Sequence, residues 1–452
     1  MKRSKGLTRA LVPVGALSLV LSGCAGAGGG GSDAGGTKTV KVALVSNPQM
    51  QDLKKLAPQF EKSHPGIKLE FSVLPENQLR DSVTKDIATK SGQYDVASID
   101  NLNGSTFAKK GWLTDLGPLA KKTSGYDTGD FIPSMWTLNQ EKGIQYGVPF
   151  YGESTFLMYR KDLFEKAGLK MPAKPTWDQV AKLADKLDTK DVSGICLRGK
   201  PGWGENMGVL STVIQTFGGS VYDSHFKAQM NSPATTKAVK FYTDLVKKDG
   251  EAGAANAGFT ECLSTMGRGK AAMWYDSTVG ASLLADSKQS SVAGKIGLAP
   301  APVVKTKSAG WLSSWSFMIP KTSKNTDAAW KFVSWATSKE YAKLVGDKLG
   351  WTRVPPGVRT STYEIPEYRS AAKDYADATL AQMKSVNPKQ PGVAPQPWVG
   401  TNYVAIPEYP DLGTKISQEM SAVIAGRESV SAALGKSQGW AEKVAESGGY
   451  QK

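Results

Sequence analysis

The sequence predicts an α/β fold made of two lobes with a cleft between them. Strand-like and helix-like segments alternate from Thr39 onward, and a second such series begins after Gly147-Val148-Pro149-Phe150. A proline-rich passage, Pro300-Ala301-Pro302, then precedes a further strand and two helices. Because β-α-β order places strands in a parallel sheet covered by helices, we expect one mainly parallel sheet in each lobe. The chain is expected to cross between the lobes near residues 149 and 302.

The first series is defined by its apolar spacing. Runs of β-branched and apolar residues predict strands, apolar residues at three- and four-residue intervals predict helices, and Pro-Gly pairs end them. In order, the segments are a strand at 40–45, a helix at 50–62, a strand at 67–74, a helix at 76–90 and a strand at 94–99. Polar loops follow the first and third strands. Asn47 and Gln49 lie in one loop and Asp100 in the other, where functional side chains of parallel sheets gather.

The second series carries clearer helix signals. Thr176 and Gln179 form a capping-box pattern before an amphipathic helix, and Ser232-Pro233 begins a helix that ends near Gly250. Between them, residues 193–197 predict a short strand that leads into Arg198 and the stretch Gly199-Lys200-Pro201-Gly202-Trp203-Gly204-Glu205-Asn206. After the proline-rich passage we expect a strand at 311–319 and helices at 326–337 and 338–344.

The N-terminus carries an export signal. Four basic residues precede a short apolar run from Ala10 to Leu21, which is too short to span a bilayer. The following Leu21-Ser22-Gly23-Cys24 resembles a bacterial lipobox, which implies removal of residues 1–23 and lipidation of Cys24. The alternative is a plain secreted protein with a chance cysteine at the cut. Residues 24–37 are Gly-rich and predict a flexible tether, so we expect the folded part to lie at the extracellular face of the cell membrane, lipid-anchored.

Composition excludes several classes of function. The 452 residues carry a formal charge of +15, of which four charges belong to the leader, and no basic stripe indicates nucleic-acid binding. The chain has only two histidines, so neither a Ser-His-Asp triad nor a His-ligated metal site is expected, and no cofactor is indicated. Cys196 and Cys262 are the other cysteines; an oxidising exterior favours a disulfide between them, and two buried free thiols are the alternative.

Longer motifs indicate a family. The stretches that carry the resemblance are Gly147-Val148-Pro149, Tyr159 to Leu169, Pro175-Thr176-Trp177, Gly269 to Met273 and Ile319 to Asn325. On these the chain resembles family 1 extracellular solute-binding proteins, the receptor components of carbohydrate ABC importers. Tyr151 to Ser154, Cys196 to Asn206, Ala272 to Asp276 and Gly350 to Gly357 are most similar to the group that binds sorbitol and mannitol. Around Trp315 the chain departs from that group, because Ser313 and Ser314 stand where the group is more aromatic.

The resemblance implies a two-lobe periplasmic-binding-protein-like fold of type II, with the ligand cleft at the hinge. We expect residues 38–149 and 302–355 in the first lobe and residues 150–301 and 356–452 in the second. It also implies a monomer that captures a polyol or related sugar without chemistry on it, and delivers it to the membrane subunits of an ABC permease.

A polyol site needs carboxylates that accept from hydroxyls, Arg or amide groups that donate, and aromatic faces that cover carbons. We expect the ligand to be contacted by Asn47, Gln49, Asp100, Glu153, Arg198, Trp203, Trp274, Asp276, Trp315 and Arg353. For the acidic and amide residues, the alternatives are helix caps, turns and ion pairs; for the tryptophans, core packing. Glycines around Trp203 are expected to let the two sides of the cleft close on the ligand.

Three other functions remain as alternatives. A receptor of the same fold for mono- or oligosaccharides differs only in ligand. A secreted glycoside hydrolase would use Glu153 and Asp276 as its acid and base, although the predicted order of elements is not that of a barrel. A surface adhesin would not require the polar and aromatic clustering. Met266 to Ala271 only faintly resembles a phosphate-binding loop, since it lacks the first glycine and the final Ser or Thr.

Overall fold

A five-stranded sheet forms the centre of the first lobe. The computed structural model describes residues 36–451, and from Thr37 the chain forms one compact unit. The strand order is β2-β1-β3-β10-β6. The strands are β1 (Lys38–Val45), β2 (Ile67–Leu74), β3 (Val96–Ile99), β6 (Val148–Glu153) and β10 (Ser313–Met318). β1 pairs in parallel with β2 and β3, whereas β10 pairs antiparallel with β3 and β6.

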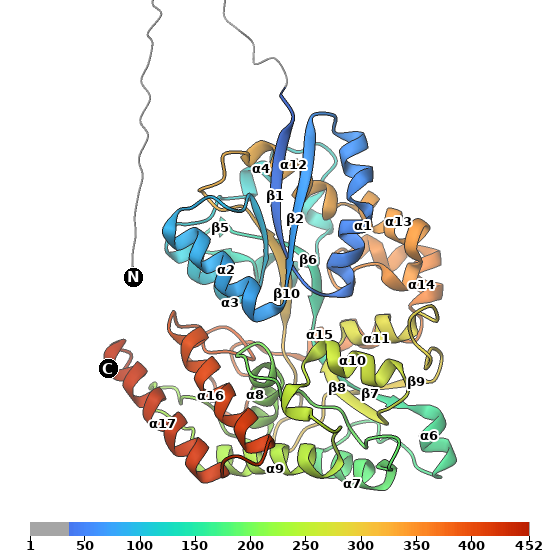
Figure 1. The fold of residues 1–452 in the computed structure, drawn as a ribbon, viewed down its shortest axis with the longest axis vertical. Coiled ribbons are helices and arrows are strands. Elements are labelled where there is room, and N and C mark those ends of the chain that lie inside the picture. The colour runs from blue at the N-terminus through green and yellow to red at the C-terminus, as the bar shows by residue number, and fades with distance from the viewer. Residues whose placement is uncertain (1–35, 452) are drawn as a thin grey trace, which may run out of the picture. The chain divides into compact units, whose positions relative to one another are not determined.

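Helices cover both faces of this sheet (Figure 1). They are α1 (Pro48–Ser63), α2 (Glu76–Thr89), α3 (Asn101–Lys109), α4 (Gly117–Lys122), α5 (Pro133–Thr137), α12 (Thr326–Ala336), α13 (Lys339–Leu349) and α14 (Pro366–Ala371). The hairpin β4 (Gln140–Glu141) and β5 (Ile144–Gln145) and the 3₁₀ turns η1 (Thr128–Asp130), η3 (Trp351–Arg353) and η4 (Thr360–Glu364) complete this half. Val40, Val42 and Leu44 are fully buried. The helices therefore exclude water from the middle of the sheet, where burial of apolar area stabilises the fold.

The second lobe has a smaller sheet of different construction. Its order is β8-β7-β9, with β7 (Thr155–Arg160), β8 (Met273–Ser277) and β9 (Ile296–Pro300). Both strand pairs are antiparallel, which corrects the expectation of a mainly parallel sheet here. The predicted strand at 193–197 makes only isolated parallel bridges, Ser193 to Ala271 and Cys196 to Trp274. Residues 193–197 thus run parallel to the edge strand β8 and touch it at two bridges, without forming a continuous ladder of hydrogen bonds.

Helices of the second lobe come from two separate parts of the chain. They are α6 (Lys161–Lys166), α7 (Trp177–Leu187), α8 (Asn206–Phe217), α9 (Pro233–Asp249), α10 (Phe259–Gly267), α11 (Val279–Ala285), α15 (Ala376–Ser385), α16 (Tyr409–Ile424) and α17 (Val430–Ser447), with η2 (Ala254–Asn256). The capping box of Thr176 and Gln179 is present at the start of α7. α16 and α17 were not expected from the sequence, and they pack with α8 and α9 (Figure 1).

Strand pairing indicates where the chain passes between the lobes. β6 ends at Glu153 in the large sheet and β7 begins at Thr155 in the small one, so the passage lies at Ser154. The return passage precedes Ser313, and a third lies between Ala371 and Ala376, because α14 packs against η3 and η4 whereas α15 packs against β9. We propose these positions as the lobe boundaries, in place of 149, 302 and 355. The difference arises because a crossing strand has no sequence signal of its own.

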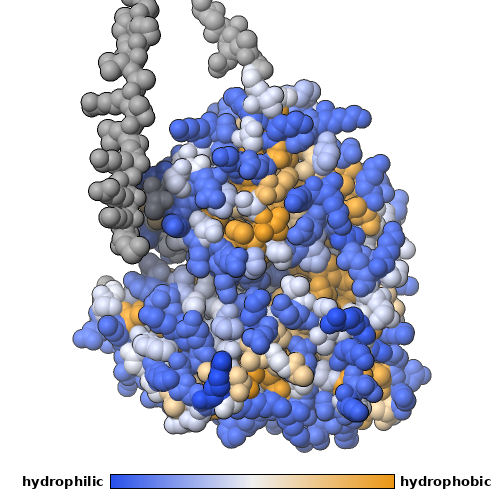
Figure 2. Space-filling model, viewed as in Figure 1, coloured by the Kyte–Doolittle hydropathy of each residue, from blue (hydrophilic) through white to orange (hydrophobic). Residues whose placement is uncertain are grey.

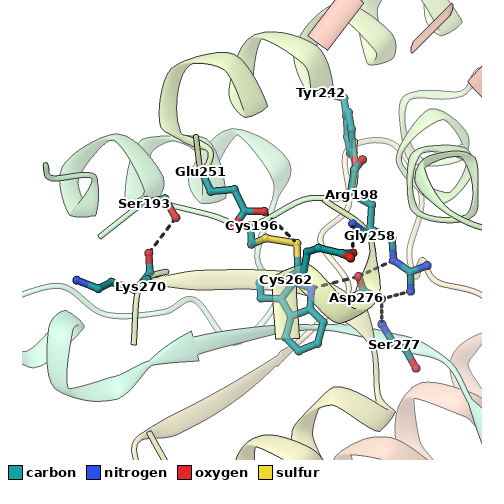
Figure 3. Close-up of a disulfide and its surroundings, with 12 residues drawn as sticks. Ser193, Cys196, Arg198, Tyr242, Glu251, Gly258, Cys262, Lys270, Asp276 and Ser277 are labelled. Carbon is teal, nitrogen blue, oxygen red and sulfur yellow. Dashed lines mark hydrogen bonds and ion pairs between the residues drawn. A yellow bond between two sulfur atoms is a disulfide. The ribbon is translucent and has the colours of Figure 1, made fainter. Parts of the chain in front are cut away.

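The predicted disulfide is confirmed. Cys196 and Cys262 are bonded, with their Cα atoms 5.7 Å apart, and both are fully buried (Figure 3). The bond joins the segment that leads into Arg198 to helix α10. Two walls of the second lobe are thereby held together covalently.

The face of the molecule drawn in Figure 2 is largely polar. Within residues 36–451, the large apolar side chains that stand out as exposed are Val304, Val393 and Val399. No helix in this range has the length and apolarity needed to cross a membrane. The predicted signal peptide at 1–23, Cys24 and nearly all of the tether at 24–37 lie outside the described residues.

Candidate ligand-binding cleft

A cavity of about 220 Å³ lies between the two lobes. Its first-lobe wall comprises Ser46, Asn47, Gln49, Pro75, Glu76, Arg80, Asp100, Asn101, Tyr151, Glu153, Ser313 and Trp315. Its second-lobe wall comprises Arg198, Lys200, Trp203, Gly204, Glu205, Phe259, Thr260, Glu261, Val279, Trp311, Asn402 and Tyr403. Seven of the ten predicted contact residues are among them: Asn47, Gln49, Asp100, Glu153, Arg198, Trp203 and Trp315.

Three residues of the first lobe stand where strands β1 and β3 end. Asn47 caps α1, since its Oδ1 accepts from the Met50 N–H at 3.0 Å. Asp100 caps α3 in the same way, through the Asn103 N–H at 3.1 Å. The helix-cap alternative therefore holds for both residues, and both also line the cavity. Gln49 differs, because its buried Oε1 has no hydrogen-bond partner among the described residues and so offers a free acceptor.

Arg80, which the sequence analysis missed, organises the first-lobe wall. Its Nε donates to Asp100 Oδ2 at 2.9 Å and its Nη1 to Glu76 Oε2 at 3.1 Å. Burial opposes its charge, but the two carboxylates outweigh burial and raise the pKa of Arg80. The Glu76–Arg80 spacing of four residues at a helix start, directly after a strand, was the signal in the sequence.

Arg198 is the corresponding cation of the second lobe. Its Nε and Nη2 donate to the two oxygens of Asp276 at 2.8 and 2.6 Å (Figure 3). Its Nη1 donates to the Gly204 carbonyl at 3.1 Å. Such a two-pronged pair fixes the plane of the guanidinium. Arg198 lines the cavity, and its Nη1 also lies 3.5 Å from Glu205 Oε2.

Asp276 and Trp274 do not line the cavity, contrary to the expectation that they contact the ligand. Both are fully buried, and the Trp274 indole Nε1 donates to Asp276 Oδ2 at 3.1 Å (Figure 3). Asp276 is thus occupied by Arg198 and Trp274 and lies behind the arginine. Their place in β8 determines this, because the segment that leads into Arg198 bridges to the same strand and brings the guanidinium to Asp276.

The glycine-rich stretch places Trp203 in the wall of the cleft. Trp203 is 5% exposed, and the Arg80 guanidinium of the opposite lobe lies 4.4 Å from its ring centroid. Asn77 of α2 also reaches across, since its Nδ2 donates to the Pro201 carbonyl at 3.1 Å. A Cβ added at Gly204 would lie 2.6 Å from the Arg80 guanidinium. The absence of that side chain lets the two lobes touch here.

Two carboxyl groups of the cavity have raised pKa values. Burial raises the pKa of Glu153 to about 7, although Ser277 donates a hydrogen bond to it. Burial, together with repulsion from Glu76, also raises the pKa of Glu205 to about 7. Glu205 Oε2 makes no hydrogen bond within the described part of the chain and lies 3.5 Å from Arg198 Nη1. Groups near their pKa both donate and accept, as hydroxyl groups of a ligand require.

Aromatic side chains supply the apolar parts of the cavity. Trp315 lies on β10, 6% exposed, and its ring is 5.3 Å from the Arg80 guanidinium. Trp311 was not singled out from the sequence; its buried Nε1 has no acceptor among residues 36–451 and is a free donor at the cavity wall. Asn402 and Tyr403 were missed as well, because their loop has no periodic pattern.

Arg353 lies outside the cavity. It donates to both oxygens of Asp52 on α1, at 2.6 and 2.7 Å, and to Asp286 at the end of α11, at 2.9 Å. The expectation of ligand contact is therefore replaced by a link between the lobes. The described residues contain one cluster with metal-like spacing, Cys196, Glu251 and Cys262, but its two sulfurs are bonded to each other.

Comparisons of the sequence and of the structure with known proteins both find solute-binding proteins. Residues 46–343 match the model of the bacterial extracellular solute-binding protein family. The chain is 40% identical over 420 residues to the mannitol-binding protein of Pseudomonas aeruginosa PAO1, covering 92% of this chain and 95% of that protein. A solute-binding protein structure from Agrobacterium vitis S4 with bound D-mannitol is 45% identical, with a TM-score of 0.89 and coverage of 92% and 100%. A solute-binding protein from Agrobacterium radiobacter K84 in complex with ribitol is 26% identical, with a TM-score of 0.80 and coverage of 91% and 99%.

Proposed function

Since the chain belongs to the bacterial extracellular solute-binding proteins, we propose that it captures an acyclic polyol, with mannitol first, for an ABC importer. One observation carries the choice of ligand: the structural relative with D-mannitol bound is matched over its whole length at 45% identity. The cavity of this chain agrees with that choice, because it has the groups that an alditol needs.

The cavity suits a neutral chain of hydroxyl groups. Arg80 and Arg198 are fixed by carboxylates and present donors from opposite lobes. Gln49 Oε1 and Glu205 Oε2 make no hydrogen bond among the described residues, although Glu205 Oε2 lies 3.5 Å from Arg198 Nη1. Because hydrogen bonds that involve a charged group contribute about 1.5–3 kcal/mol each, a few of them supply micromolar affinity.

Capture is coupled to closure in this proposal. The ligand lies between walls from both lobes, and the same walls meet through the Arg80–Trp203 and Asn77–Pro201 contacts. A ligand that contacts both walls binds the closed form better and shifts the population toward it. The membrane subunits of the importer then recognise the closed form.

We further propose that the protein acts outside the cell as a lipid-anchored monomer and catalyses no reaction. The leader and the Leu21-Ser22-Gly23-Cys24 pattern support export and lipidation. The glycosidase alternative would need Asp276 as a free base, yet Asp276 is buried and paired with Arg198. Mass spectrometry of Cys24 in membrane fractions tests the anchor, and chromatography of polyols after incubation tests for turnover.

Calorimetry of the purified chain tests the ligand. We expect binding to mannitol and weaker binding to ribitol, glucose and maltose. Trp203→Leu should weaken mannitol binding, because it removes both a cavity wall and the surface under Arg80. Trp112→Leu, at a half-buried position of the first lobe outside this cavity, is the matched control. A chain that binds maltose tightly and no alditol would refute the proposal.

A further inference from the structure

A second cavity, of about 240 Å³, lies within the second lobe. Its walls are α8, the turn that follows it, the start of α16, and the loop from Gly392 to Val404. Tyr403 lines both this cavity and the ligand cavity of the cleft, so the two cavities are neighbours. The volume has room for several waters or for a small ligand.

Three polar atoms at this cavity make no hydrogen bond to the rest of the described lobe. They are Gln215 Oε1 and the hydroxyls of Ser211 and Tyr409, and these two hydroxyls lie close enough to interact with each other. Ser211 is 7% exposed and Tyr409 is fully buried. Buried polar groups are nearly always paired, because an unpaired one loses its hydration without compensation. A free amide oxygen and a pair of hydroxyls that bond to nothing else in the described lobe leave donors and acceptors for a molecule that enters the cavity.

The remaining wall residues define the chemistry of that guest. The rings of Tyr222, Trp398, Tyr403 and Tyr409 line the cavity. Asp223 is the one charged residue among the lining residues, and its oxygens already accept from the N–H groups of His225 and Lys227 and from Gln229 Nε2. Aromatic faces, hydroxyls and an amide without free charge suit a neutral ring that has hydroxyl groups and an apolar C–H face.

The cavity is close to the surface, and the loop from Gly392 to Val404, here called the roof, covers it with an ordered structure. Val393 lines the cavity and is 51% exposed. Within the roof, Gln396 Nε2 donates to the Pro388 carbonyl at 3.2 Å and Trp398 Nε1 donates to the Tyr403 carbonyl at 3.1 Å. The Tyr403 ring packs edge-on against Trp203, with centroids 6.3 Å apart. The roof is thus continuous with the wall of the cleft.

We propose that this cavity is a sugar subsite that takes one pyranose ring, through Ser211, Gln215 and Tyr409 and the surrounding aromatic faces. The ring has two possible sources. It is either a glycosyl group attached to an alditol that lies in the cleft, with the Tyr403 side chain turned aside, or a free monosaccharide. The first source rests on the proposed function; the second does not.

Calorimetry on the intact chain distinguishes the sources. One arm titrates 1-O-α-D-glucopyranosyl-D-mannitol into free protein, and the other titrates glucose into protein saturated with mannitol. Tyr409→Phe and Ser211→Ala each delete one oxygen. Whichever sugar probe binds, we expect either variant to weaken its affinity by about tenfold. Mannitol affinity should stay within about twofold of the wild-type value, and the melting temperature should not fall.

Tyr341→Phe is the matched control, because Tyr341 is also buried with an unpaired hydroxyl, belongs to α13 of the first lobe and does not line this cavity. If mannitol binds, but the glucosyl-mannitol binds no more tightly than mannitol and glucose gives no heat, the cavity holds water only and the subsite proposal is overturned. Equal losses for mannitol and for the glucosyl probe in Tyr409→Phe would also overturn it. If mannitol itself fails to bind, the proposed function fails, and glucose titrated into ligand-free protein still decides the subsite.

Discussion

Replacing Gly204 with alanine tests whether contact between the lobes contributes to ligand affinity. The added Cβ would lie 2.6, 2.7 and 2.8 Å from the Nη2, Nη1 and Cζ atoms of Arg80. The guanidinium retreats only by giving up its bonds to Asp100 and Glu76 or its place over Trp203. Overpacking of this kind costs about 1–3 kcal/mol.

The cost falls on the closed form alone, because Gly204 and Arg80 belong to different lobes and separate on opening. We therefore expect the dissociation constant for mannitol to rise by a factor of about 5 to 150. The melting temperature of the ligand-free protein should stay unchanged. Calorimetry and thermal unfolding of the same samples measure both quantities.

A control separates this effect from a general effect of the substitution. Gly439→Ala lies in α17, where an added Cβ meets nothing within 4 Å. It should raise stability by about 0.5–1 kcal/mol and leave affinity unchanged. Unchanged mannitol affinity in Gly204→Ala would refute the role of the interlobe contact. A matching fall in ligand-free stability would show instead that the glycine serves folding.

Three further predictions concern buried groups of the second lobe and the hinge. Burial raises the pKa of Glu153 from 4.5 to about 7, so the stability that its protonated form contributes is full below pH 4.5 and is lost as the pH rises through 7. Glu153→Gln should therefore lessen the fall in the free energy of unfolding between pH 4.5 and 8, by at most about 3 kcal/mol. A variant whose stability depends on pH as the wild type does would contradict this. Asp276→Asn should lower the free energy of unfolding by about 3–5 kcal/mol and abolish mannitol binding, because it breaks a buried ion pair with Arg198. If denaturant unfolding of the variant gave the same free energy as the wild type, this prediction would be wrong. Replacing Cys196 and Cys262 with alanine should cost about 2–4 kcal/mol, since their bond closes a loop with a sequence separation of 66, and equal melting temperatures with and without reductant would argue against it.

Predicted residues line the cavity where their place follows from local structure. Asn47 and Asp100 come directly after strands, and a residue at the end of a buried strand lies at the edge of the sheet wherever the sheet goes. Trp203 and Arg198 were found for a similar reason, since glycines and a buried segment flank them. All four line the cavity.

The predicted site was incomplete or misplaced where the answer depended on a partner far along the chain. Asp276 has the right chemistry for a ligand contact, yet Arg198 occupies it. Arg353 was expected in the cleft but bonds to Asp52 and Asp286. Arg80 has no distinctive sequence pattern beyond its spacing from Glu76, and only the meeting of two lobes places it over Trp203.

By itself the sequence determined the alternation of strands and helices, the capping of α7, the disulfide partners and the class of ligand chemistry. These depend on apolar spacing, on backbone hydrogen bonding near each residue and on the residue types available. Only the tertiary structure decided that the smaller sheet is antiparallel, which charged groups neutralise one another, and which remain free at the cavity. Pairing of strands and charges depends on distances between segments remote in the chain, and packing of the whole lobe fixes those distances.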